Sequence, residues 1–149
     1  MNPKSTHLRA KRRSLASIFL GTRVIVSYNT VMKFRRVLLV ILWMLVIFYW
    51  SSVPELNSGL EVLWDTVLRK LAHISEFAIL AGLVTYALGR RRWQLELALM
   101  ISAAYAVSDE IHQLFVRQRV GSIIDVGIDV AGIIIGLLLY KKLFLRRGR

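Results

Sequence analysis

Residues 108–136 read SDEIHQLFVRQRVGSIIDVGIDVAGIIIG, and this stretch decides how the rest of the chain is interpreted. Four carboxylates, one histidine and two arginines stand there beside runs that are apolar enough for a lipid bilayer. An ionisable side chain at membrane depth costs roughly 2.5–3.5 kcal/mol on insertion scales, so a chain that keeps several of them is expected to use them. The stretch is therefore the predicted functional site.

The composition of the whole chain indicates a small integral membrane protein. With 149 residues, 56% of them hydrophobic, and a mean hydropathy of +0.53, the chain is too apolar for an ordinary soluble domain. Its length allows about four spans of roughly 20 residues each. A formal charge of +12 would suggest nucleic acid in a soluble protein, but no basic face with interleaved aromatic residues occurs outside the apolar runs, so no nucleic-acid partner is expected. The chain has no cysteine, which excludes disulfides, thiolate metal sites and a cysteine nucleophile.

Four hydrophobic runs predict an all-α membrane protein, a bundle of four transmembrane helices in residues 37–140. The runs cover about residues 37–53, 71–88, 93–116 and 122–140. Between the first two, Ser58 and Glu61 form a helix-capping pattern, and apolar residues at helical spacing predict a short amphipathic helix before the second span.

The segments outside the bundle are basic. Residues 1–36 form a leader that is expected to be poorly ordered, with an amphipathic surface helix as the alternative interpretation of its apolar patch. Met32 reads as an alternative start of the natural protein, directly before the first span. Residues 141–149 form a basic tail.

The distribution of basic residues predicts the topology. Nine precede the first run, three separate the second from the third and five follow the fourth, whereas the two remaining loops carry two each. Because cytoplasmic loops are enriched in Lys and Arg, both termini are expected to be cytoplasmic. This topology brings polar residues of the second, third and fourth spans to the outer end of the bundle.

Helical spacing groups the predicted site residues further. One face of the third span collects polar side chains at offsets of three and four: Ser102, Tyr105, Asp109, His112 and Gln113. Glu110 points about 100° away from this face. Buried carboxylates pair with cations or take up protons, so an acid and base pocket is predicted from Asp109, Glu110, His112, Asp125 and Asp129. The predicted ligand-binding residues are Lys70, His73, Glu76, Gln113 and Arg119.

Some of these side chains have simpler interpretations. Asp125 follows Ser122 by three residues and would also suit a helix cap. Arg119, which would grip an anionic head group, would also suit a solvated loop. Lys70 would also fit as a residue at the end of a span whose side chain extends to the membrane–water interface. Asp129 has no such alternative, because it lies roughly 10 Å inside its helix.

Two further spacings bear on metal binding and on helix packing. His73 and Glu76, at i and i+3, resemble half of a metal-binding helix motif. Further ligands are not evident in the sequence, so no metal and no other cofactor is expected. Gly132 and Gly136 form the small-x3-small pattern that lets helices approach closely in lipid, which turns the acidic face of the fourth span toward another helix or a partner subunit.

The same residues resemble the VanZ-like family of small bacterial membrane proteins. The resemblance covers about residues 37–140 and is carried by Lys70-x2-His73-x2-Glu76, Ser108-Asp-Glu-Ile-His-Gln-Leu-Phe, Arg119, Asp125-x3-Asp129-x2-Gly132-x3-Gly136 and the Ser51-Ser52-x-Pro54 turn. Such proteins often have a glycine before the arginine of the outer loop. Gln118 stands there in this chain, so the shape of that loop is expected to differ.

The resemblance implies a multi-pass protein of the bacterial inner membrane. The family takes its name from a protein that lowers susceptibility to teicoplanin, a glycopeptide antibiotic that acts on cell-wall precursors at the outer cell surface. An outward-facing pocket suits an activity at that surface.

The leading functional hypothesis is a pocket among membrane lipids that binds, modifies or moves an anionic envelope component such as a lipid-linked precursor. Proton- or ion-coupled transport is one alternative, and assembly of homo-oligomers through Gly132 and Gly136 is another. Transport would require polar groups to continue to the cytoplasmic side, where the sequence offers Thr85 and Glu96. No nucleophile elbow, phosphate loop, dinucleotide fingerprint or zinc-protease motif is present, so the sequence leaves open whether the protein is an enzyme.

Overall fold

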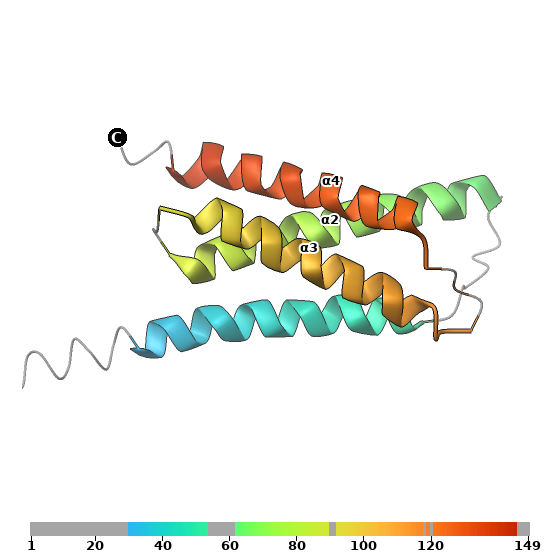
Figure 1. The fold of residues 1–149 in the computed structure, drawn as a ribbon, viewed down its shortest axis with the longest axis horizontal. Coiled ribbons are helices and arrows are strands. Elements are labelled where there is room, and N and C mark those ends of the chain that lie inside the picture. The colour runs from blue at the N-terminus through green and yellow to red at the C-terminus, as the bar shows by residue number, and fades with distance from the viewer. Residues whose placement is uncertain (1–29, 54–61, 90–91, 118, 120, 146–149) are drawn as a thin grey trace, which may run out of the picture. The chain divides into compact units, whose positions relative to one another are not determined.

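The computed structural model describes residues 30–53, 62–89, 92–117, 119 and 121–145. Over these residues the chain forms helices joined by turns and contains no strand. The first helix covers residues 30–52. It is followed by α2 (Val62–Leu88), α3 (Gln94–Gln113) and α4 (Ile123–Tyr140), which continues into a short π-helical turn, η1 (Lys141–Leu145) (Figure 1).

The chain divides into two units, residues 1–35 and 36–149, and the packing described below is that of the second unit. Within it, the first helix and α3 end where α2 and α4 begin (Figure 1). The opposite end has the turn from α2 to α3, where Gly89 ends α2 with a φ of +69°. Glycine adopts this left-handed conformation without the steric cost that a side chain would bring.

Helix α4 packs closely against α2 at two glycines. A Cβ atom on Gly132 would lie 2.5 Å from the carbonyl oxygen of Ile74, and one on Gly136 would overlap the carbonyl group of Ala78. The predicted packing role of the two glycines is therefore confirmed, and it serves a contact within one chain. The homo-oligomer through Gly132 and Gly136 stays a prediction, and within one chain the glycine face already contacts α2.

The core of this unit is small and its outer surface is apolar. The buried hydrophobic residues are Ile47, Phe77, Leu80, Ala81, Val84, Ala98, Ala106 and Ile133. Large apolar side chains such as Met100, Leu138 and Ile124 are exposed by more than half of their surface. Among the described residues, Thr66–Leu88 and Ile123–Leu145 are long and apolar enough to cross a membrane. Exposed apolar surface on this scale indicates contact with lipid or with another apolar surface.

The predicted helices and the observed ones agree in class and approximate position. A helix occupies each of the four hydrophobic runs, whereas four membrane crossings and the position of the termini stay predictions. The segment predicted as a separate amphipathic helix is the beginning of α2 instead. No proline interrupts residues 62–88, so the helical hydrogen bonds continue through the predicted boundary.

Parts of several sequence predictions lie outside the described residues. These are the Ser58–Glu61 cap, residues 1–29 of the predicted leader and residues 146–149 of the predicted tail. The last residues of the predicted leader, 30–36, are already part of the first helix.

Candidate functional site

A polar cavity of about 340 Å³ lies at the end of the bundle where α2 and α4 begin. It is lined by Thr66, Arg69, Lys70, His73, Glu110, Gln113, Arg119, Asp125, Ile128 and Asp129. Seven of these ten are predicted site residues, and they come from α2, α3, α4 and the loop before α4. The fold therefore brings together side chains that are up to 63 positions apart in the sequence.

A second cavity of about 310 Å³ adjoins the first and is lined by Trp50, Ser51, Arg69, Ala72, His73, Glu76 and Arg119. Arg69, His73 and Arg119 border both cavities. The predicted ligand-binding residue Glu76 belongs to this second cavity and is partly buried.

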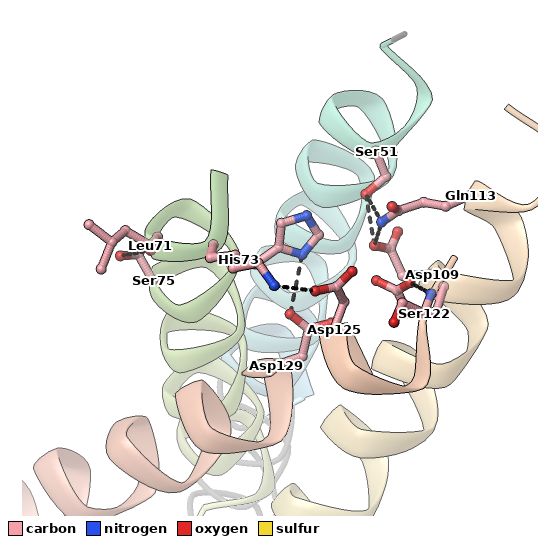
Figure 2. A network of polar contacts seen from close by, with 11 residues as sticks. Ser51, Leu71, His73, Ser75, Asp109, Gln113, Ser122, Asp125 and Asp129 are labelled. Atoms are coloured by element: carbon pink, nitrogen blue, oxygen red, sulfur yellow. Dashed lines mark hydrogen bonds and ion pairs between the residues drawn. The ribbon is translucent and has the colours of Figure 1, made fainter. Parts of the chain in front are cut away.

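Asp109 is held by two donors from different helices. Its Oδ2 accepts a hydrogen bond from Ser51 Oγ at 2.8 Å and one from Gln113 Nε2 at 2.9 Å (Figure 2). Asp109 is 2% exposed, and both donors are buried as well. The bond from Ser51 ties the end of the first helix to α3, and the bond from Gln113 lies within α3.

Asp129 is paired with a histidine across the α2–α4 contact. His73 Nδ1 lies 3.2 Å from Asp129 Oδ1 (Figure 2). Asp129 is fully buried, and the His73 side chain is 13% exposed. Asp129 is thus as deeply placed as predicted, and it has a partner, His73, that sequence spacing did not identify.

Glu110, and not Asp125, accepts the hydrogen bond from the backbone amide at the start of α4. Ser122 is the N-cap, and its Oγ accepts a hydrogen bond from the Ile124 amide. The Ser122 amide donates to Glu110 Oε2 at 2.8 Å, so a carboxylate from α3 takes the place that the third residue of a capping box usually fills. Asp125 instead pairs with Lys70, whose Nζ lies 3.0 Å from Asp125 Oδ1.

The structure places His112 outside the residues that line either cavity. Its ring stacks on Phe48 with centroids 4.3 Å apart, and Nε2 lies 3.0 Å from Ser52 Oγ. Ser52 donates its only hydroxyl hydrogen to the carbonyl of Phe48, so His112 Nε2 is the donor in the contact with Ser52. His112 therefore contacts the first helix, about 60° around α3 from Asp109.

The Arg119 side chain donates hydrogen bonds to two backbone carbonyls and does not simply extend into solvent. Its Nε donates to the Val53 carbonyl at 3.1 Å, and Nη2 donates to the Trp50 carbonyl at 3.0 Å. The last carbonyls of a helix have no partner within the helix, and Arg119 provides one for the first helix. The guanidinium still borders both cavities.

Three hydrophilic side chains that line the cavities, Ser51, Thr66 and Arg69, were not among the predicted site residues. Arg69 and Thr66 precede His73 by four and seven positions, so they share its helix face and helical spacing would have found them. Ser51 belongs to the turn that resembles the family, but helical spacing could not assign it to the site, because its partner Asp109 is 58 residues away. Among the described residues, His73, Asp109 and Glu110 offer metal-ligand atoms that lie within 4.8 Å of one another.

An all-helical bundle with apolar spans and a polar cavity at one end defines a small helical membrane protein. The VanZ/LLP1 family model matches residues 27–146, and the chain belongs to this family. No curated protein and no solved structure matches the chain.

Proposed function

We propose that the polar cavity binds the anionic head group of a cell-envelope component, such as a lipid-linked cell-wall precursor, at the outer face of the bacterial inner membrane. The observation that carries this proposal is the cavity wall, where Arg69, Lys70 and Arg119 stand together with Glu110, Asp125 and Asp129. Arginine and lysine are the residues that proteins use most for phosphate and carboxylate groups.

The size of the cavity suits a head group rather than a whole lipid. About 340 Å³ is near the lower end of the range for small-molecule sites, roughly 300–1,000 Å³. The lipid tail of a bound precursor would stay in the bilayer beside exposed apolar side chains such as Ile124 and Leu68.

The Lys70–Asp125 pair provides an entry point for the anion. Both side chains are partly exposed, at 43% and 33%, so the pair is worth at most about 1 kcal/mol. A phosphate can therefore replace Asp125 as the partner of Lys70 at little cost. Glu110 and Asp129 are more deeply buried and do not compete for Lys70 at the entrance.

The proposed ligand links the pocket to glycopeptide susceptibility. Teicoplanin acts on cell-wall precursors at the outer surface, so a protein that binds such a precursor there would alter the target available to the drug. Asp109, Asp129 and their partners would then hold the polar end of the site in shape.

The described residues favour this binding role over a polar path through the bundle. The cavity toward the opposite end, about 550 Å³, is lined by Ile79, Gly82, Leu83, Tyr86, Tyr140, Phe144 and Leu145, which are mostly apolar. Thr85 is buried and donates its hydroxyl to the Ala81 carbonyl in its own helix.

The test is binding of a polyprenyl phosphate by the full chain in nanodiscs, measured by native mass spectrometry. Lys70→Ala should weaken binding at least about tenfold, because it removes one charge-assisted contact of about 1.5–3 kcal/mol. Lys141→Ala, at the other end of α4, is the matched control and should bind like the wild type. Equal binding by both variants would refute the proposal, and in cells Lys70→Ala should also remove any protection against teicoplanin.

A further inference from the structure

Three buried carboxylates, of which Glu110 and Asp129 line the first cavity and Asp109 lines neither cavity, keep one oxygen each without a hydrogen bond. Asp109, Glu110 and Asp129 are 2%, 5% and 0% exposed. In each, one oxygen is bonded as described above, whereas Asp109 Oδ1, Glu110 Oε1 and Asp129 Oδ2 are buried and accept nothing from the described residues. A buried carboxylate oxygen without a donor or cation is costly, so each of the three calls for a partner.

The geometry of the cluster is close to that of a metal site. One ligand atom each from His73, Asp109 and Glu110 can be chosen so that all three lie within 4.8 Å of one another. Two ligands on opposite sides of a zinc ion are roughly 4.2 Å apart, given bonds of about 2.1 Å. Shifts of under about 1 Å would therefore close the three side chains around one ion.

The His73–Asp129 pair supplies the support that such a ligand needs. With Asp129 ionised, Nδ1–H donates to it across 3.2 Å, and the lone pair of the neutral ring lies on Nε2. Histidines that bind metal commonly donate their other N–H to a carboxylate in this way, which fixes both the tautomer and the ring orientation.

Two of the cations that line the cavity, Lys70 and Arg119, have contacts away from the three carboxylates. Lys70 Nζ pairs with Asp125, at the more exposed part of the cavity, and Arg119 donates to two carbonyls of the first helix. Asp109 Oδ1, Glu110 Oε1 and Asp129 Oδ2 accept no hydrogen bond from any described residue. A divalent cation would give such buried oxygens a partner.

We infer that His73, Asp109 and Glu110 bind a divalent first-row transition metal ion, with Asp129 orienting His73. In the sequence, His73 pairs only with Glu76 on the same helix and no metal is expected, whereas the fold brings two carboxylates from α3. One imidazole with carboxylates suits Zn²⁺ or Mn²⁺, while an all-oxygen site would suit Mg²⁺ or Ca²⁺. The inference goes beyond the proposed function and does not depend on anion binding at Lys70.

The experiment measures Zn²⁺ binding to the purified full chain in detergent. Metal content after dialysis is determined by mass spectrometry, and affinity is determined by competition with a chelating dye. The wild type should retain about one Zn²⁺ per chain and bind it in preference to Mg²⁺. His73→Gln and Asp109→Asn should each lower the affinity at least about a hundredfold, whereas Asp129→Asn should lower it by roughly 10–100-fold.

His112→Gln is the matched control. His112 lies in the last turn of α3, near Asp109 and Glu110, but it contacts Ser52 and Phe48. This variant should keep the wild-type stoichiometry. Size-exclusion chromatography checks that each variant is folded. The absorption spectrum of bound Co²⁺ in the folded variants then shows whether metal ligands are lost. A wild-type protein without bound Zn²⁺, or a His73→Gln variant that binds it as tightly as His112→Gln does, would overturn the inference. Lys70→Ala should keep the metal while losing polyprenyl phosphate, so failure of one proposal is visible separately from failure of the other.

Discussion

Replacing Gly136 by alanine should separate α2 from α4. The added Cβ would overlap the Ala78 carbonyl oxygen and lie 2.8 Å from the carbonyl carbon and the Cα atom of Ala78. These are backbone atoms, which cannot rotate away, so the helices must move apart by several tenths of an ångström or more. Overpacking of this kind typically costs about 1–3 kcal/mol.

The control is Gly127→Ala on the same helix, where a Cβ would meet no atom within 4 Å. Both variants gain the same helix propensity, up to about 1 kcal/mol, so their difference isolates the packing cost. Unfolding in mixed micelles by SDS titration, followed by circular dichroism, should show Gly136→Ala less stable than Gly127→Ala by about 1–3 kcal/mol. Equal stability of the two variants would refute the close α2–α4 contact.

Two other substitutions test contacts around the site. Trp43→Phe removes the indole N–H that donates to the Glu76 carbonyl at 2.9 Å, and the same SDS titration should show a loss of about 0.5–1.5 kcal/mol. An unchanged unfolding curve would mean that this bond does not hold the first helix to α2. Asp125→Asn breaks the half-exposed pair with Lys70 and should change stability by less than about 1 kcal/mol while tightening polyprenyl phosphate binding. Weaker binding would contradict the proposed role of Lys70.

The fold class and much of the polar site could be predicted because both depend on spacing within single helices. The face shared by Asp109 and Gln113 follows from an offset of four, and the structure joins the two by a hydrogen bond. The close approach at Gly132 and Gly136 follows from small residues at the same offset. Residues three and four apart lie on the same face of any α-helix, so these neighbours follow from the sequence alone.

Contacts between helices could not be predicted in the same way. The pairs Ser51–Asp109 and His73–Asp129 join residues 58 and 56 positions apart, so they depend on which helices become neighbours and in which rotation. The role of Glu110 was hidden for the same reason, because its partner is a backbone amide in the following loop. His112 was assigned to the pocket by its helix face, yet a rotation of about 60° was enough to direct it to the first helix.

The proposed function requires that the polar end of the bundle faces away from the cytosol. The chain has no cysteine, so single cysteine substitutions report accessibility without background. Arg117 is exposed at the polar end, and Arg92 is exposed at the other end. In intact spheroplasts, a membrane-impermeant maleimide should label Arg117→Cys at once and Arg92→Cys only after the membrane is permeabilised. Labelling in the reverse order would place the cavity in the cytosol and contradict the account.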